Sequence, residues 1–368
     1  MKKSIRVLQI GMSYAIGGTE TYLIQQYRNI DKSKLSYDFV NINSHKVMAY
    51  SEEITKNGDK VFNICARHKN PFKHYFQWIM LMIKESKNYH AITLNSNSLE
   101  YVFPLLISKL FKIPIRVIHS HNAGYQHEIG VFRKLLVKFN SCLVRWCATD
   151  YFACSSKAGK WMFGKNVAFR LIHNAIDVNR FKYRDTVREA VLNELGLKNS
   201  LVLGHIGRFD YQKNHEFLIK IFYEFQKFKS NSVLLLVGIG DNLPLIKRMV
   251  EELGIKNKVI FLGYRDDIPK LMQAIDIFLL PSRFEGLPLV GIEAQAAGVS
   301  CFFSNAITDE LGITYLAHYI SLKETPKFWA ECILNNISNH RRDMSKEIRQ
   351  AGYDINEEIK NIENFYTE

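Results

Sequence analysis

The sequence of 368 residues contains no apolar run that reaches the roughly 18–20 residues needed to span a bilayer. Its 6 cysteines are scattered and form no C-x-x-C pair, which speaks against a disulfide framework and indicates reduced thiols in a cytosolic protein. Zinc-ligand spacing, the aromatic strings of RNA-binding domains, short repeats and low-complexity tracts are also absent. The apolar stretch within segment 1–10 ends at Gly11, which is too early for a signal peptide. The segment therefore predicts a first strand. These absences exclude the common classes of membrane-spanning, disulfide-stabilised and nucleic-acid-binding proteins.

Basic charge is concentrated in the first half of the chain. The net charge is +13; residues 1–175 contain 25 Lys and Arg against 10 Asp and Glu, whereas residues 176–368 contain 24 against 26. Because the sequence has no nucleic-acid motif, an anionic membrane surface is the better candidate for the partner of this positively charged half of the chain. Segments 67–84 and 132–138 mix basic and aromatic residues, as helices at a membrane interface do, although ordinary helices with one solvated face show the same pattern. We therefore expect a peripheral protein at the inner face of the plasma membrane.

Short apolar segments alternate with helical stretches along the chain, which is the pattern of doubly wound α/β domains with parallel sheets. The length, and a restart of the pattern after residue 200, predict two such domains. Because ligands of open α/β sheets bind beyond the carboxyl ends of the strands, the loops at those ends are candidate sites. The expected strands are 5–10, 37–41, 60–64, 91–94, 115–118, 151–153 and 169–172, then 200–206, 233–237, 258–261, 277–280 and 299–304.

The segment 283–294, Arg-Phe-Glu-Gly-Leu-Pro-Leu-Val-Gly-Ile-Glu-Ala, carries two carboxylates eight positions apart. It follows a buried strand and enters a helix with Pro288 near its first turn. Glu285 should therefore lie in the loop at the carboxyl end of the strand, and Glu293 about two turns into the helix. An acidic acceptor, free backbone N–H groups and a second acceptor then follow one another, which suits a ligand with hydroxyls at both ends and phosphate in the middle.

This string resembles the signature of the family 4 retaining glycosyltransferases, and most closely that of bacterial enzymes of capsular and exopolysaccharide synthesis. The family has the GT-B fold, in which two Rossmann-like domains face each other across a cleft. The resemblance implies that Glu293 binds the ribose of the nucleotide and that Glu285 contacts hydroxyls of the donor sugar. It also implies that the backbone of Gly286 and Leu287 meets the diphosphate.

Arg208 and Lys213 stand five positions apart in the loop after the first strand of the second domain. Both can reach one polyanion, and fixed cations there would stabilise the charge that develops on a leaving nucleoside diphosphate. The family has a similar Gly-Arg-x4-Lys-Asn string, which implies that these two residues bind the diphosphate. Because no Asp-x-Asp element or His/Asp cluster appears, we expect catalysis without a bound metal or other cofactor.

Two loops of the first domain also resemble those of the family. Gly17 and Gly18 follow the first strand, where glycine lets the backbone approach phosphate or sugar, and the family's Gly-Gly-x-Glu loop implies a place near the diphosphate and the acceptor. His119 and His121 follow strand 115–118, and strand alternation puts both on one side of the chain. The family carries a functional His at this strand end, so either residue can contact the donor, with His121 preferred. No third ligand accompanies them to form a metal site.

Tyr264 and Arg265 end another strand of the second domain, where the resemblance implies contact with the nucleobase, mostly through the backbone. The segment 173–181 resembles the family's interdomain stretch. The implied domains are an acceptor-binding domain over 1–175, a nucleotide-sugar-binding domain over 176–352, and a helix over 353–368 that crosses back to the first domain.

The sequence therefore predicts a retaining, metal-independent glycosyltransferase of cell-surface polysaccharide synthesis. It would move a hexose or N-acetylhexosamine from a nucleotide sugar, preferentially a UDP-sugar, to a lipid-linked oligosaccharide. Two alternatives stay open: a nucleotide-sugar epimerase or hydrolase of the same fold, and a non-catalytic subunit that binds a nucleotide sugar.

Overall fold

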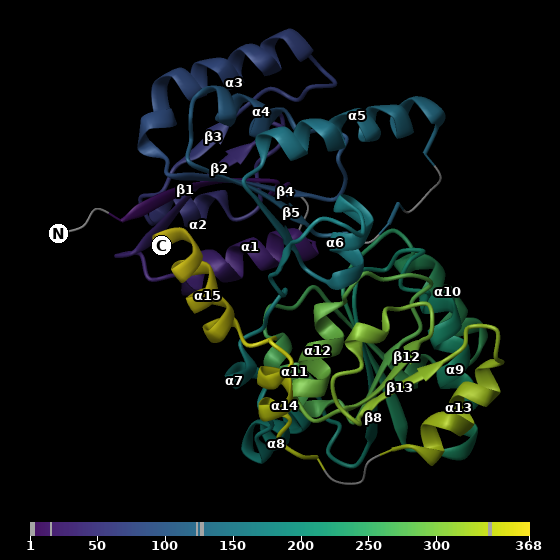
Figure 1. The fold of residues 1–368 in the computed structure, drawn as a ribbon. Coiled ribbons are helices and arrows are strands. Elements are labelled where there is room, and N and C mark those ends of the chain that lie inside the picture. Colours follow the sequence, from purple (N-terminus) through teal and green to yellow (C-terminus); the bar gives the residue numbers. More distant parts are fainter. Residues whose placement is uncertain (1–3, 15–16, 123, 126–128, 338–340) are drawn as a thin grey trace. The chain divides into compact units, whose positions relative to one another are not determined.

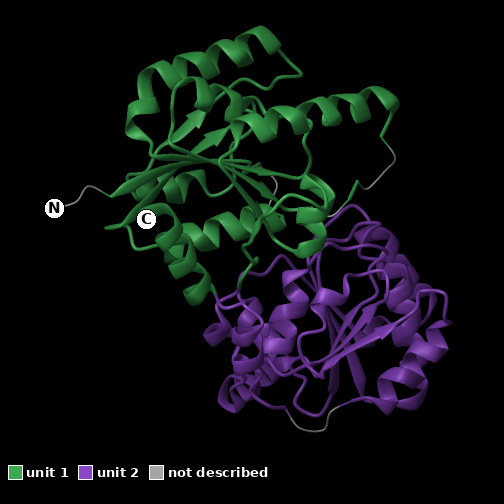
Figure 2. Cartoon of the chain, viewed as in Figure 1, with its two compact units in different colours: residues 1–175, 355–368 green, residues 176–354 purple. Residues whose placement is uncertain are grey.

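The structure, a computed structural model, describes residues 4–14, 17–122, 124–125, 129–337 and 341–368. The chain forms two compact units: the first comprises Met1–Ala175 and Ile355–Glu368, and the second comprises Ile176–Asp354 (Figure 2). The chain thus changes unit after Ala175 and again after Asp354, where the sequence predicts boundaries after residues 175 and 352.

The first unit is built on a sheet of seven parallel strands in the order β3-β2-β1-β4-β5-β6-β7. The chain fills one side of β1 first and then crosses to β4 on its other side, so the direction of winding reverses between β1 and β4. The strands are β1 (Ile5–Ile10), β2 (Leu35–Asn41), β3 (Val61–Asn63), β4 (Ala91–Ser96), β5 (Ile115–Ser120), β6 (Asp150–Ala153) and β7 (Arg170–Leu171).

Helices cover both faces of this sheet, and each face has its own apolar core. Helices α3 (Pro71–Glu85), α4 (Phe103–Leu110), α5 (Val131–Cys147) and α6 (Ser156–Phe163) pack on one face, and α4 lies against both α3 and α5 (Figure 1). Helices α1 (Gly18–Asn29), α2 (Ser51–Lys56) and α15 (Ile355–Thr367) pack on the other face. The short 3-10 helix η1 (Ser86–Asn88) precedes β4.

The second unit repeats the architecture with six parallel strands in the order β10-β9-β8-β11-β12-β13. The reversal of winding lies between β8 and β11. The strands are β8 (Leu201–Ile206), β9 (Ser232–Val237), β10 (Val259–Gly263), β11 (Ile277–Leu280), β12 (Ser300–Ser304) and β13 (Ala317–Ile320).

Two apolar cores again separate the helices of the second unit into two layers. Helices α7 (Val178–Phe181), α8 (Asp185–Glu194), α11 (Ile268–Ala274), α12 (Leu289–Ala296) and α14 (Ser345–Gln350) cover one face. Helices α9 (His215–Phe228), α10 (Leu243–Glu252) and α13 (Pro326–Asn335) cover the other. The 3-10 helices are η2 (Lys256–Lys258) and η3 (Asp309–Leu311).

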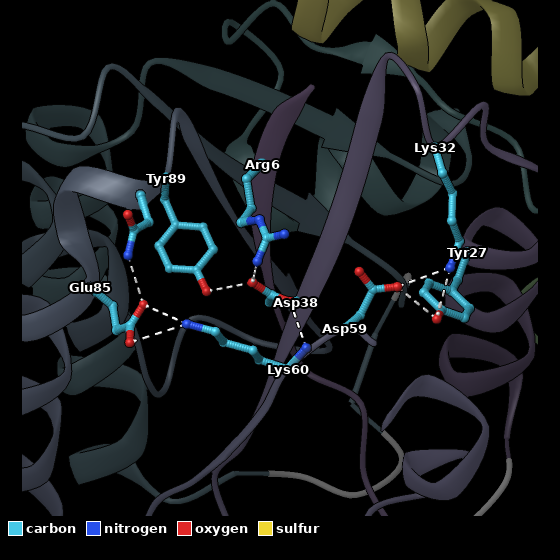
Figure 3. Close-up of polar contacts among 9 residues, drawn as sticks. Arg6, Tyr27, Lys32, Asp38, Asp59, Lys60, Glu85 and Tyr89 are labelled. Carbon is cyan, nitrogen blue, oxygen red and sulfur yellow. Dashed lines mark hydrogen bonds and ion pairs between the residues drawn. The ribbon is translucent and has the colours of Figure 1, made fainter. Parts of the chain in front are cut away.

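A buried carboxylate, Asp38 of β2, joins several elements near the amino-terminal ends of the strands of the first unit (Figure 3). It accepts hydrogen bonds from Arg6 Nη1 at 3.0 Å, from Tyr89 Oη at 2.7 Å and from the backbone N–H of Lys60 at 2.6 Å. These donors come from β1, from the segment before β4 and from the segment before β3. A carboxylate without solvent contact is thus fully hydrogen-bonded, as burial of its charge requires.

Candidate functional site

The candidate site of the second unit lies where the winding of the sheet reverses. The loops after β8 and β11 leave adjacent strands there at their carboxyl ends, which is where open α/β sheets bind ligands. Asn214 connects the two loops, since its Nδ2 donates to the carbonyl of Pro281 at 3.0 Å. Asn214 has a φ of +57°, in the left-handed region that Asn tolerates better than most residues.

The loop after β8 is packed tightly against the loop after β9, and this contact requires glycine. Gly238 has a φ of +140°, and a Cβ atom built there would lie 2.0 Å from the carbonyl oxygen of Gly207. A Cβ atom on Gly240 would lie 2.4 Å from the carbonyl oxygen of Phe209. The sequence analysis did not single out these glycines, although a Gly-x-Gly directly after a strand is a signal of close backbone approach. They hold the backbone on either side of Arg208.

Lys213 and Glu285 form an ion pair at the centre of the site, although 72 residues separate them. Lys213 Nζ lies 2.6 Å from Glu285 Oε1, and both side chains are largely buried. Glu285 Oε1 also accepts from Ser282 Oγ at 2.9 Å, and Oε2 accepts from Gln212 Nε2 at 2.9 Å. Two of the three Lys213 ammonium hydrogens and about one of the four carboxylate lone pairs stay available for a ligand. Gln212 and Ser282 were not among the predicted site residues, because nothing in the sequence shows which neighbours reach Glu285.

Arg208 is the exposed cation of the site. Its side chain is 66% exposed, and its nearest partner, Asp210 Oδ2, lies 3.6 Å away. Such a surface contact contributes little energy, so the guanidinium can turn toward a ligand at small cost. The structure thus gives the two predicted cations different environments, since Lys213 is held in place and Arg208 is loosely held.

The loop after β11 presents unpaired backbone donors. The N–H groups of Gly286 and Leu287 form no hydrogen bond with the residues that the structure describes, and a Cβ atom on Gly286 would meet nothing within 4 Å. Helix α12 follows, with Pro288 as its N-cap. Unpaired N–H groups leading into a helix N-terminus favour an anion.

Glu293 is the fifth residue of α12, a little more than one turn into the helix rather than the predicted two. Its partly buried carboxylate makes no hydrogen bond or ion pair with the described part of the chain. Burial raises its pKa to about 7, and the positive charge of Arg180 on α7 counteracts this only in part. A carboxyl group in such surroundings lacks donors and would gain from the hydroxyl groups of a ligand.

The two residues predicted to contact the nucleobase differ in whether their side chains have partners within the unit. Tyr264 is 67% exposed. Arg265 donates from Nε and Nη2 to the two carboxylate oxygens of Asp267, at 2.7 and 2.6 Å. The side chain of Arg265 is therefore occupied within its own loop, and only its backbone is available to a base.

His119 and His121 lie together at the carboxyl end of β5 in the first unit, with ring centroids 4.0 Å apart. His119 is buried, and His121 is partly exposed. Burial lowers the pKa of His121 to about 3, so its ring is neutral at pH 7. Asn95 donates to Gln9 and to the carbonyl of Ile10, so its Oδ1 is the acceptor at 3.0 Å from His121 Nε2. His121 therefore carries its proton on Nε2, held by an Asn that the sequence analysis did not identify.

Gly17 and Gly18 begin α1 and form an open backbone turn. Gly17 has an extended φ of −143°, and a Cβ atom on Gly18 would meet nothing within 4 Å. Glu20 accepts from the backbone N–H groups of Ser13 at 2.9 Å and Gly17 at 3.1 Å. Neither glycine has a positive φ, although a Cβ atom on Gly17 would lie 3.1 Å from Glu20 Oε2.

No group of three or more His, Cys, Asp or Glu residues within the described ranges could hold a metal ion. Among the helices that the structure describes, none has both the length and the apolar character needed to cross a membrane.

Comparisons with known proteins show the family and the fold to which this chain is similar. Residues 187–310 match the family described as glycosyl transferases group 1. EpsF of Bacillus subtilis (strain 168), whose name describes it as a glycosyltransferase, is 30% identical over 98% of this chain and 96% of its own. The UDP-Gal:alpha-D-GlcNAc-diphosphoundecaprenol alpha-1,3-galactosyltransferase of Escherichia coli is 24% identical over 82% of this chain and 79% of its own.

The solved structure of Anabaena Alr3699/HepE in complex with UDP superposes with a TM-score of 0.73, at 19% identity over 99% of this chain and 96% of that chain. This likeness supports the fold, in which each of two units is a doubly wound parallel sheet. The chain has the GT-B fold and belongs to the group 1 glycosyltransferases.

Proposed function

We propose that this glycosyltransferase moves a hexose or N-acetylhexosamine from a UDP-sugar to a lipid-linked oligosaccharide in the synthesis of a cell-surface polysaccharide. The observation that carries the proposal is the arrangement at the turning point of the second sheet. Two cations, two unpaired N–H groups and a carboxyl group without donors lie on the loops after β8 and β11 and on the helix that follows, and together they match the parts of an activated sugar.

Each part of the donor finds a matching group. Glu293 would accept hydrogen bonds from the ribose hydroxyls, which supply the donors that its carboxylate lacks. Arg208, Lys213 and the N–H groups of the loop after β11 would bind the diphosphate. The free lone pair of Glu285 would accept from a sugar hydroxyl, while the ion pair with Lys213 holds that carboxylate in place. UDP as the nucleotide is supported by the HepE complex and by the UDP-Gal donor in the name of the Escherichia coli relative.

The two cations also provide the chemical assistance. Cleavage of the bond between sugar and phosphate places new negative charge on the diphosphate, and fixed cations stabilise that charge more strongly in the transition state than in the ground state. Arg208 and Lys213 would serve in place of a bound metal. We further propose that the anomeric configuration is retained, by attack from the face that the diphosphate leaves, with a phosphate oxygen taking the proton of the incoming hydroxyl.

A membrane-bound acceptor is supported by the surface of α5. Large apolar side chains are exposed along this helix at successive intervals of one, three, four and seven residues, with Lys134, Lys138 and Arg145 between them. A helix with exposed apolar side chains and interspersed cations fits the interface of an anionic bilayer. We therefore propose peripheral association with the inner face of the plasma membrane. The exposed apolar residues of α5 are Val131, Phe132, Leu135, Phe139 and Trp146.

One incubation separates the proposal from its alternatives. Purified protein is given UDP-sugars and a lipid-linked sugar diphosphate, and the products are resolved by chromatography and mass spectrometry. A new glycolipid is expected. An isomerised or hydrolysed nucleotide sugar without glycolipid would instead indicate the epimerase or hydrolase, and no conversion would indicate the non-catalytic subunit.

A matched pair of arginine variants tests the site itself. Arg208→Ala should lower the transfer rate by about 100-fold, since loss of one charge-stabilising group costs on the order of 2–4 kcal/mol in the barrier. Arg248→Ala, which removes an exposed arginine from α10 of the same unit, should leave the rate unchanged.

A further inference from the structure

We propose that a pocket of the first unit binds the phosphate groups of a lipid-linked acceptor, and that the adjoining face of α3 holds its apolar chain. The inference rests on the proposed function, because it names the place where the second substrate of that reaction lies. The pocket has a volume of about 370 Å³ and is lined from the carboxyl ends of several strands, by Gly11, Tyr14, Asn43, Arg67, His68 and Tyr101 among others.

The pocket is suited to an anion. No Asp or Glu is among the described residues that line it. Arg67, Lys69 and Lys73 follow one another from the pocket wall into the first turn of α3, and none of their side chains forms an ion pair or hydrogen bond with a described residue. Other cations of this unit are paired with a carboxylate, as Arg133 is with Glu100 at 2.6 Å. Cations without acidic partners at a concave surface attract and bind phosphate.

A buried hydrogen-bond chain positions Arg67. His74 is buried, and burial lowers its pKa, so its ring is neutral. A carbonyl can only accept, so His74 Nδ1 donates to the carbonyl of Cys65 at 2.6 Å, and Nε2 then accepts the hydroxyl proton of Tyr101 at 2.6 Å. The ring of Tyr101 is thereby fixed beneath the guanidinium of Arg67, 5.0 Å from its carbon. This cation–π contact orients Arg67 without using any of its N–H donors.

The exposed face of α3 explains why the phosphate should carry a lipid. Phe72, Phe76, Ile79 and Ile83 follow one another at intervals of four, three and four residues, and their side chains are 87, 62, 40 and 59% exposed. This spacing places them on one stripe of the helix, away from the core face that contains Trp78 and Met82. The stripe begins at Phe72 in the first turn of α3, five residues after Arg67 in the pocket wall. An apolar stripe next to unpaired cations matches a long-chain alcohol esterified to phosphate better than it matches free phosphate or nucleic acid.

The test measures binding of three soluble probes to the full chain in the presence of saturating UDP, which occupies the donor site. Farnesyl diphosphate carries both the apolar chain and the diphosphate, inorganic pyrophosphate carries the anion alone, and farnesol carries the chain alone. Arg67→Ala should weaken farnesyl diphosphate binding about tenfold, as expected for the loss of a charged hydrogen bond. Phe72→Ser combined with Phe76→Ser should weaken farnesyl diphosphate and leave pyrophosphate unchanged.

Lys87→Ala is the matched control, because Lys87 is an exposed cation of the same unit. It precedes β4 and so lies near the amino-terminal end of that strand, whereas the pocket lies at the carboxyl ends of the strands. The control variant should bind farnesyl diphosphate as the wild type does. Equal loss in Lys87→Ala and Arg67→Ala would show diffuse attraction and overturn the proposal, and so would unchanged binding in Arg67→Ala. Pyrophosphate binding as tightly as farnesyl diphosphate would overturn the assignment to a lipid.

The same variants also distinguish a failure of this site from a failure of the donor site. All variants replace exposed residues, so they should fold and keep the wild-type affinity for UDP, which is measured in parallel. Absence of UDP binding by the wild type would refute the proposed function while leaving Arg67-dependent binding of farnesyl diphosphate in place. Normal UDP binding without any binding of farnesyl diphosphate would refute only the acceptor site.

Discussion

The carboxyl group of Glu293 offers the sharpest test of the donor site, because its pKa of about 7 lies within the accessible pH range. Only the ionised form accepts hydrogen bonds from both ribose hydroxyls with full strength. UDP should therefore bind with release of a proton at low pH, and its affinity should increase as the pH rises through about 7.

The size of the effect follows from the titration. With a pKa of about 7, roughly one tenth of the protein has an ionised Glu293 at pH 6 and roughly nine tenths at pH 8. If the protonated form binds UDP about tenfold more weakly than the ionised form, the affinity should increase about fivefold over this range, which corresponds to about 1 kcal/mol. The terminal phosphate of UDP titrates near pH 6 as well, so the slope of the wild type alone does not identify the protein group.

Glu293→Gln provides the control. Its amide has almost the same shape and cannot ionise, while the phosphate of UDP titrates as before. The variant should bind UDP about tenfold more weakly than the wild type at pH 8 and only about twofold more weakly at pH 6. Isothermal titration calorimetry in buffers of different ionisation enthalpy reports both the affinity and the number of protons released. Parallel pH profiles for the two proteins, or equal proton release, would show that Glu293 does not contact the ribose.

Three further changes test other parts of the molecule. Lys213→Ala should lower the transfer rate by about 100-fold, measured at saturating donor, because it removes a cation from the leaving group and leaves Glu285 without its ion-pair partner; an unchanged rate would contradict the diphosphate assignment. Asp38→Asn should lower the free energy of unfolding, measured in urea, by about 2–4 kcal/mol, because it removes the charge from a buried acceptor of three hydrogen bonds. The control Glu53→Gln, at an exposed ion pair, should change this free energy by less than about 1 kcal/mol. Phe132→Ser combined with Phe139→Ser should reduce sedimentation with anionic liposomes several-fold without changing the circular dichroism spectrum; equal sedimentation of variant and wild type would refute the role of α5.

Much of the fold could be predicted because its signals are local. A continuous apolar run identifies β9 and β11, since strands buried on both faces need apolar side chains at every position. Strand β13 was not predicted, because it lies at the edge of the sheet and its sequence Ala-His-Tyr-Ile is mostly only partly buried. The short spans of β3 and β7 have the same cause, since an edge strand buries less apolar surface.

The sequence predicted the residues of the candidate site, but it could not predict the contacts between them. The Gly-Arg-x4-Lys-Asn string indicated Lys213, and the distant carboxylates indicated Glu285, but their ion pair depends on how β8 and β11 pair in the sheet. The basic segment 132–138 suggested that its cations face lipid, yet Arg133 is bound in a bidentate contact to Glu100. A charge run does not reveal which of its members has a partner far away in the sequence.

Three carboxylates, Asp38, Glu285 and Glu293, differ in how many hydrogen bonds they receive and in whether a ligand can reach them. Asp38 lies toward the amino-terminal ends of its sheet, receives three hydrogen bonds and has no exposed surface, so a ligand cannot reach it. Glu285 lies beyond the carboxyl ends of the other sheet, and its bonds to Lys213, Gln212 and Ser282 leave about one lone pair free. Glu293 receives no hydrogen bond from the described residues, and burial raises its pKa toward neutrality. Since an unsatisfied buried carboxylate destabilises the folded protein, its presence at the ligand edge is best explained by a bound state that supplies the missing donors. We propose that the two ribose hydroxyls supply them, which is why the Glu293 titration bears on the whole assignment of the donor site.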